Sequence, residues 1–209
     1  MEYRCEAANV TGFIQQLAVA YVTRGYFYYV LGQVPEGKDP RHVDEKLVRK
    51  YGIEMNKGAR CRRKALGYAN LQYVRYKRSF VLLATEGKHE FFQSEAGQVR
   101  DVREMPIKLF GYSVSHRNGR TCVRIEQRLY LGLKARMAEQ SVHRPLPWFQ
   151  SAFRSFGFEP YAPVRSQLHC ILRAVNRRRK VAQLELVPST SIRTVRKIVS
   201  PFEEARSVP

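Results

Sequence analysis

The sequence of 209 residues has few cysteines, few acidic side chains and no long apolar run. Its four cysteines, Cys5, Cys61, Cys122 and Cys170, form no C-x-x-C pair and have no histidine at zinc-knuckle spacing. This pattern argues against a zinc site or a disulfide framework and favours reduced thiols. No apolar stretch approaches the ~20 residues that span a bilayer, and no signal segment is visible at the start. We therefore expect a cytoplasmic protein that folds without disulfides.

The chain also lacks the short motifs that identify common enzymes. It contains no Walker phosphate loop, no dinucleotide-binding fingerprint and no G-x-S-x-G nucleophile motif. The sequence therefore predicts no cofactor and names no reaction.

Acidic residues are missing from two long segments in which basic residues are abundant. The whole chain has 37 Lys and Arg against 18 Asp and Glu, a net charge of +19. Residues 55–85 carry eight cations and no acid, and residues 105–202 carry eighteen cations against four acids. Such a surface repels itself unless a polyanion neutralises it, and nucleic acid is the first candidate. A membrane surface is disfavoured, because the cations do not follow one amphipathic helix.

Periodicity and turn residues predict mixed secondary structure. The predicted helices cover residues 11–23, 40–51, 127–137, 146–156 and 162–182. The predicted strands cover residues 26–34, 67–75, 79–85, 98–103, 108–115 and 191–199. Asn118-Gly119 predicts a two-residue hairpin turn, since both positions require a positive φ. Residues 56–64 are expected to form a basic loop or a single turn.

These elements predict an α+β fold whose antiparallel sheet, ferredoxin-like or related, is flanked by helices. We expect an α+β sheet module over residues 1–126. A basic helical extension, ending in a short strand, is expected over residues 127–209.

A first nucleic-acid contact surface is predicted in the segment that lacks acids. Cations that follow a nucleic-acid backbone and tyrosines that stack on bases are typical of single-strand binding. The alternative is that the tyrosines are ordinary sheet residues and that the cations serve solubility. The predicted contact residues are Arg60, Arg62, Arg63, Lys64, Tyr73, Arg75, Tyr76, Lys77 and Arg78, with Tyr68 beside them.

A second contact surface is predicted at the end of the last helix. It consists of Arg173 and the run Arg177, Arg178, Arg179 and Lys180. Successive residues of a helix are rotated by about 100°, so four consecutive cations cannot all lie on one side. At least one of them must face the protein or a partner.

A third set of residues resembles part of an enzyme family. An apolar strand leads to Lys88-His89-Glu90-Phe91, and a later helix carries Tyr130 and Lys134. This arrangement resembles the replication initiators and relaxases of the His-hydrophobic-His class. The resemblance implies a divalent metal held by two histidines and a tyrosine nucleophile. The chain departs from that pattern, because it has one histidine where two are expected and a Tyr–Lys spacing of four instead of three.

We therefore expect a protein that binds DNA or RNA through basic and aromatic surfaces. It would be a subunit or accessory factor of a DNA- or RNA-processing or mobile-element machine, with protein partners in a larger nucleoprotein complex. The alternative is a metal-dependent nicking endonuclease or replication initiator that uses Tyr130, Lys134 and His89.

Overall fold

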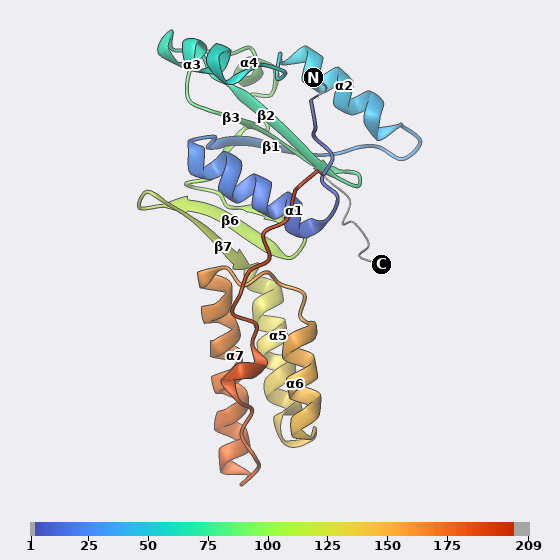
Figure 1. The fold of residues 1–209 in the computed structure, drawn as a ribbon, viewed down its shortest axis with the longest axis vertical. Helices are drawn as coiled ribbons and strands as arrows, with labels where there is room; N and C mark the ends of the chain where they lie inside the picture. The colour runs from blue at the N-terminus through green and yellow to red at the C-terminus, as the bar shows by residue number, and fades with distance from the viewer. Residues whose placement is uncertain (1–2, 203–209) are drawn as a thin grey trace. The chain divides into compact units, whose positions relative to one another are not determined.

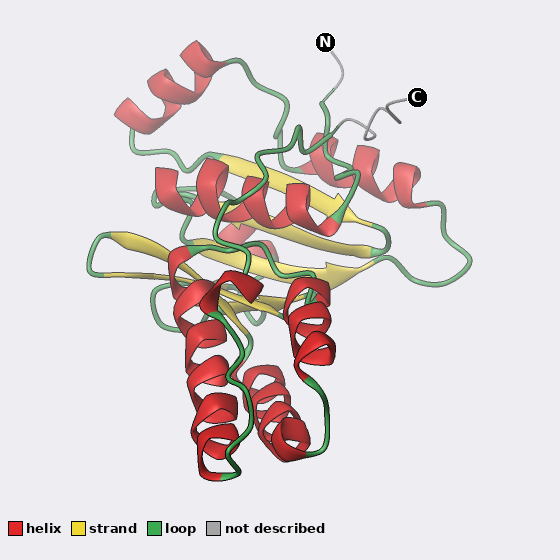
Figure 2. Cartoon of the chain, turned by 60° about the horizontal axis from the view of Figure 1, so that its bottom comes forward, coloured by secondary structure: helices red, strands yellow, loops and turns green. Residues whose placement is uncertain are grey.

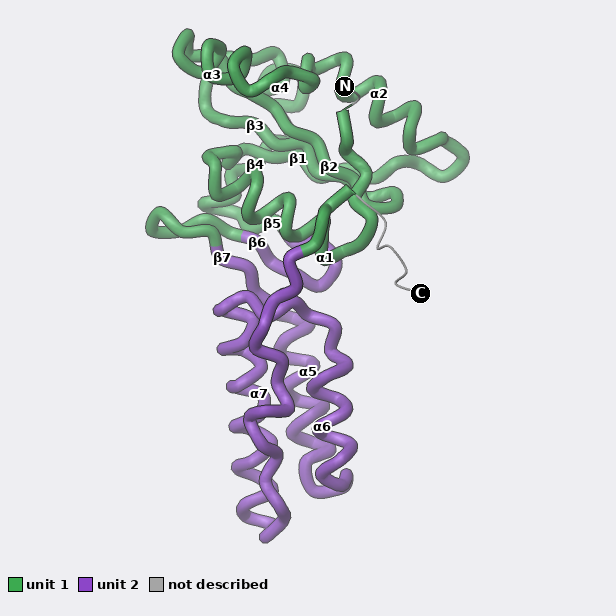
Figure 3. Tube along the Cα trace, viewed as in Figure 1, with its two compact units in different colours: residues 1–107, 115–121, 199–209 green, residues 108–114, 122–198 purple. Residues whose placement is uncertain are grey.

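The structure is a computed structural model that describes residues 3–202 (Figure 1). The chain divides into two compact units (Figure 3). The first unit comprises residues 1–107, 115–121 and 199–209, and the second comprises residues 108–114 and 122–198. Within the described residues, no helix combines the length and the apolar character that a bilayer span requires.

The first unit is built on a four-stranded antiparallel sheet. Its strands are β1 (Tyr28–Gln33), β2 (Leu71–Tyr76), β3 (Ser79–Ala84) and β4 (Arg100–Asp101), in the spatial order β2-β3-β1-β4. From β1 onward, the elements follow one another as β1, α2 with α3, β2, β3, α4 and β4. This βαββαβ order of strands and helices is typical of ferredoxin-like folds. The predicted α+β class with an antiparallel sheet is thus confirmed.

Four helices accompany this sheet. They are α1 (Val10–Gln15), α2 (Pro40–Lys50), α3 (Lys57–Ala65) and α4 (Phe91–Ser94). Helix α1 continues as a π-helix (Gln16–Tyr21) and a 3-10 turn (Val22–Arg24). Helix α1 contacts β2 and lies on the opposite side of the sheet from α2 and α3 (Figure 1). The predicted helix over residues 11–23 is therefore confirmed in location.

The basic segment 56–64 forms helix α3 of nine residues, so the prediction of a loop or a single turn was wrong. The side chain of Asn56 accepts a hydrogen bond from the Ala59 N–H (2.8 Å) and caps the first turn of α3. The segment also contains alanine and straight-chain Arg and Lys residues, which lose little side-chain freedom in a helix. A basic composition does not itself oppose helix formation.

The core of the first unit lies on both faces of the sheet. Val81, Leu82, Leu83 and Ala84 of β3 are all buried, as expected for a strand without a polar face. Leu82 packs in a cluster with Leu71 and Tyr73 of β2, beneath residues that follow α2. This packing buries most of β2 as well.

A second sheet has three strands: β5 (Ile107–Leu109), β6 (Tyr112–Arg117) and β7 (Arg120–Ile125). Asn118 and Gly119 join β6 to β7 with φ angles of 50° and 71°. The predicted hairpin is confirmed at those two residues. The division into units passes through this hairpin.

The second unit contains three long helices: α5 (Gln127–Glu139), α6 (Leu146–Ser155) and α7 (Ala162–Val181) (Figure 2). Short 3-10 turns lie at Gln140–Val142 and Ser189–Ser191. One face of α7 is fully buried, as its periodicity predicts. This face consists of Val164, Leu168, Ile171, Leu172 and Val175.

Residues 191–199, all of which the structure describes, form no strand, so the predicted final strand was wrong. Ser191 and Ile192 close the preceding 3-10 turn, and the backbone hydrogen bonds of the following residues go to side chains and not to another strand. The Lys197 N–H donates to the Glu159 carboxylate (3.0 Å), and the Thr194 carbonyl accepts from Arg165 (3.3 Å). The segment is therefore irregular in structure and is held in place by hydrogen bonds to side chains.

Candidate nucleic-acid interface

The first predicted contact surface is not continuous. Helix α3 precedes β2, whereas Lys77 and Arg78 form the turn that follows it. The six residues of β2 separate the two groups by roughly 17 Å. The prediction of one surface that contains both groups was wrong, because the strand between them is buried.

Tyr73 and Arg75, which were predicted to contact nucleic acid, lie inside the first unit. They are 0% and 2% exposed, and both bind Asp44 of α2. Burial, reinforced by the hydrogen bond to Asp44, raises the pKa of Tyr73. Neither residue can reach a ligand in this fold, because its polar group is occupied within the core.

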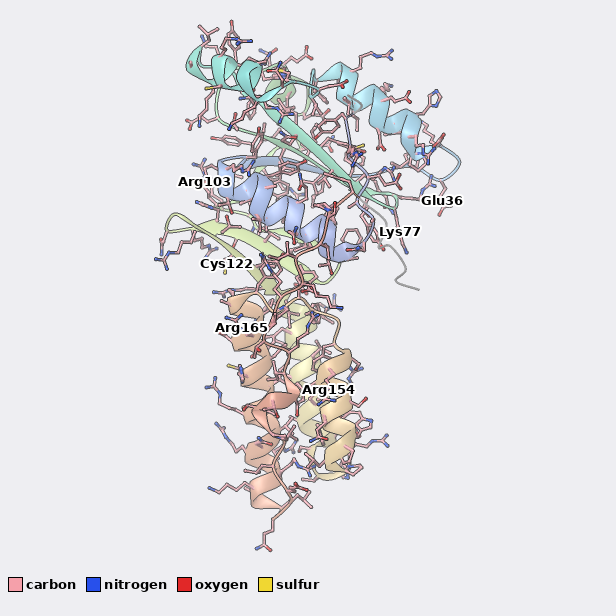
Figure 4. All side chains as sticks on the ribbon, in the orientation of Figure 1. Glu36, Lys77, Arg103, Cys122, Arg154 and Arg165 are labelled. Carbon is pink, nitrogen blue, oxygen red and sulfur yellow. The ribbon has the colours of Figure 1, made fainter. Side chains whose placement is uncertain are left out.

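The turn between β2 and β3 presents a single well-exposed cation. Lys77 lies at the tip of this turn (Figure 4) with its ammonium 5.7 Å from the centre of the Tyr76 ring. Arg78 instead donates to the carbonyls of Val34 (3.0 Å), Pro35 and Lys38, and so anchors the loop after β1. A phosphate contact is thus more accessible to Lys77 than to Arg78.

The exposed cations of α3 form the stronger part of the first surface. Lys57, Arg62 and Lys64 are exposed, whereas Arg60 and Arg63 are half-buried. Arg60 donates to the Ile53 carbonyl (3.2 Å), and Arg63 donates to the Ala69 carbonyl (3.2 Å). We call these five residues of α3 the α3 cations.

A pocket of about 950 Å³ opens beside α3, and we call it the α3 pocket. It is lined by the end of α2, by α3 and by the residues that follow β3. Its cations come from three separate segments and outnumber its acids by four to one. The cations are Arg49, Lys50, Arg63 and Lys88, and the acid is Glu90.

The walls of the α3 pocket are held by backbone pairing. Lys88 donates its N–H to the Gly67 carbonyl (2.9 Å) and accepts from the Ala69 N–H (3.1 Å), so Tyr68 and Lys88 lie side by side. A Cβ on Gly87 would lie 2.6–2.7 Å from backbone atoms of residues 67–69, and its φ is 131°. Only glycine permits this approach of the two segments.

His89 is a fixed part of the pocket wall. Its Nδ1 accepts a hydrogen bond from the Phe91 N–H (3.1 Å), and its ring lies beside the Tyr51 ring (centroids 6.3 Å apart). Burial, together with the nearby charge of Arg63, lowers the pKa of His89. The neutral ring therefore supports the start of α4.

The second predicted surface is partly present on α7. Arg173, Arg177 and Lys180 are exposed and follow one another at intervals of four and three, so they share one side of the helix. We call these three residues the α7 basic face. Ser166 and His169 precede Arg173 at the same intervals, so they continue this side toward the start of α7.

Arg179 is the cation of the run that faces the protein. It is 3% exposed, and it donates to the carbonyls of Ser141 (2.9 Å), Arg144 (2.9 Å) and Glu185 (2.6 Å). Its prediction as a ligand contact was wrong, because the helical rotation places it on the same side as Val175. Arg178 is exposed but donates to the Ala138 carbonyl (2.8 Å).

The residues of the enzyme alternative lie in different units. His89 belongs to the first unit, and Tyr130 and Lys134 lie one turn apart on α5 in the second. Burial, with the neighbouring Cys170, raises the pKa of Tyr130, which disfavours the phenolate that a nucleophile needs. Among the described residues there is no group of three or more His, Cys, Asp or Glu side chains able to hold a metal.

One stacked group was not predicted from the sequence. The Phe27 ring contacts both the His116 ring (centroids 4.7 Å apart) and the Arg103 guanidinium (4.8 Å from the ring centre), and Arg103 forms an ion pair with Asp101. Only the sheet topology brings these distant residues together, so local sequence carries no signal for the group.

No protein-family model matches the chain, and a search of curated proteins gives no match.

Proposed function

We propose that this chain binds DNA or RNA in the cytoplasm through contacts between exposed cations and phosphate groups. The charge of the second unit carries the proposal, because this unit has sixteen Lys and Arg against four Asp and Glu. Among these cations, all of which the structure describes, only Arg179 is buried. One of the four acids, Glu159, is itself buried beside Arg193. The surface is thus positive, and a polyanion would neutralise it.

The α7 basic face and the α3 cations are the proposed contact groups. Residues three and four apart on a helix are neighbours, so the α7 basic face presents three adjacent charges to a phosphate chain. Arginine suits this role, because its planar guanidinium can donate two hydrogen bonds to one phosphate. Tyr73, Arg75 and Arg179 do not belong to the proposed interface.

The proposal is tested by the salt dependence of binding. Fluorescence anisotropy with a labelled oligonucleotide, single-stranded or duplex, measures affinity between about 50 and 200 mM salt. If the α7 basic face contacts three phosphates of a duplex, the logarithm of the affinity falls by about 2.7 per log unit of salt from these contacts alone. A slope near zero contradicts the proposal.

A matched pair of charge reversals locates the contact. Arg177→Glu should reduce affinity for every sequence and decrease the salt slope by about one or more. Arg154→Glu changes the net charge equally, but it lies on α6 and outside the proposed contact groups (Figure 4). Equal losses in the two variants would mean that overall charge, and not the α7 basic face, governs binding.

We further propose that the chain acts as a subunit or accessory factor of a DNA- or RNA-processing machine. Such a factor would meet its protein partners on a shared nucleic acid. Protein partners recovered with the tagged chain should be lost after nuclease treatment. Partners that remain bound after complete digestion would contradict assembly through nucleic acid.

A further inference from the structure

From the α3 pocket we infer that the chain binds one unpaired nucleotide, with its base on Tyr68 and its phosphate among the surrounding cations. This inference rests on the proposed function and names its substrate class as a strand with at least one unpaired base. It goes beyond the phosphate contacts of α7, which read no base.

The ring of Tyr68 supplies the stacking surface. Its side chain is 46% exposed although it is aromatic, and it lines the α3 pocket. The guanidinium of Arg63 lies 5.6 Å from the ring centre, which supports the ring and adds positive charge. Bases stack on tyrosine in a sequence-tolerant way, because every base has a π-face.

Convergent cations supply the phosphate contacts. Arg49 and Lys50 end α2, and Lys88 follows β3, so three charges approach the pocket from two segments besides α3. The Nε of Arg63 is buried and has no hydrogen-bond partner among the described residues, and Nη2 already donates to the Ala69 carbonyl (3.2 Å), so Arg63 contributes its charge more than a free donor. A charged oxygen in this pocket would be held by several donors at once.

The geometry favours an unpaired base over a duplex. A base inside a duplex is covered on both faces by its neighbours, so it cannot lie against the Tyr68 ring without leaving the stack. Tyr68 is also pre-positioned, because its N–H donates to the Arg63 carbonyl (2.9 Å) and its neighbours pair with Lys88. Little ordering is then required when a base binds.

The test compares a single strand with a blunt duplex of the same sequence, using the full chain and anisotropy at fixed salt. Tyr68→Ala should weaken single-strand binding about 5- to 150-fold and leave duplex binding within about twofold. Tyr68→Phe, which keeps the ring, should bind the single strand within about twofold of the unchanged chain. Leu66→Ala is the control, since Leu66 is 72% exposed and lies just before Tyr68, outside the pocket.

A direct readout separates stacking from a structural effect. A 2-aminopurine base in the single strand should lose fluorescence on binding to the unchanged chain and to Tyr68→Phe, and it should keep that fluorescence with Tyr68→Ala. Equal losses of affinity for the single strand and the duplex, or an unchanged single-strand affinity in Tyr68→Ala, would overturn the unpaired-nucleotide site while nucleic-acid binding stands. If the unchanged chain binds neither oligonucleotide, the proposed function itself fails.

A third arm distinguishes a strand from a free nucleotide. Adenosine monophosphate should compete with the single strand only weakly, since it lacks the neighbouring phosphates that would contact the α3 cations. Tight binding of the mononucleotide, without binding of the strand, would contradict the assignment to nucleic acid.

Discussion

Arg75 of β2 and Asp44 of α2 form a buried ion pair inside the first unit. The Nε and Nη2 atoms of Arg75 donate to the two carboxylate oxygens of Asp44 at 2.9 and 2.8 Å, and the two side chains are 2% and 9% exposed. The Tyr73 hydroxyl donates to the same carboxylate (2.6 Å). Glu6 adds a second acid beside Arg75 (3.0 Å). This cation therefore fixes a helix to the sheet.

Asp44→Ala should decrease the free energy of unfolding by about 3–5 kcal/mol, because it leaves a buried guanidinium without its main partner. Urea denaturation of the variant measures this loss. Glu45→Ala is the control, since Glu45 is exposed on the same helix, and it should change stability by less than about 0.5 kcal/mol. A loss at position 44 as small as that at position 45 would mean that the pair contributes little.

Alanine substitutions at Arg179 and Lys180 should have different effects, the first on the stability of the protein and the second on nucleic-acid binding. Arg179→Ala removes the donor for three backbone carbonyls and should destabilise the second unit by about 3 kcal/mol or more, because these carbonyls lose a charged donor. Lys180→Ala should leave the melting temperature almost unchanged and should weaken nucleic-acid binding. Thermal denaturation and anisotropy measure the two effects. The opposite pattern would show that Lys180, and not Arg179, is the residue of this run that faces the protein.

Gly87→Ala should destabilise the first unit, because the added Cβ would clash with the backbone of residues 67–69 at an unfavourable φ. We expect a loss of about 1–3 kcal/mol. Gly97→Ala is the matched control, since nothing lies within 4 Å of a Cβ at that position. Similar unfolding midpoints for the two variants would contradict the tight pairing of Tyr68 with Lys88.

The sequence predicts those elements whose signal is local. The Asn118-Gly119 turn follows from the φ that each residue tolerates, and burial of β3 follows from the lack of a polar residue in Phe80–Ala84. Arg179 could also have been placed inward, because it lies four residues after buried Val175 on the same helix side.

The remaining features depend on contacts between distant residues. Burial of Arg75 requires Asp44, which lies 31 residues earlier on another element. The α3 pocket joins the end of α2, α3 and the segment after β3, and no periodicity relates these three segments. Net charge predicts that cations need a partner, but it does not tell whether that partner is a ligand or the protein itself.

The pH dependence of stability should identify the role of His89. Burial and the charge of Arg63 lower its pKa in the folded state below the unfolded value of about 6.5. When the pH falls below that value, the unfolded chain binds a proton that the folded chain resists, so stability declines. The loss is complete once the pH is below the folded pKa.

His89→Asn keeps an acceptor for the Phe91 N–H, but the asparagine side chain does not titrate. The variant should therefore lack the His89 contribution to the loss of unfolding free energy between pH 7.5 and pH 5. Arg63→Gln, which removes the neighbouring charge, should reduce the same decline without abolishing it. Urea denaturation at a series of pH values gives the difference between each variant and the unchanged chain. An unchanged pH profile in His89→Asn would mean that the ring is protonated equally in the folded and unfolded chain. His89 would then be free to act on a ligand, and the wall of the α3 pocket would need another support.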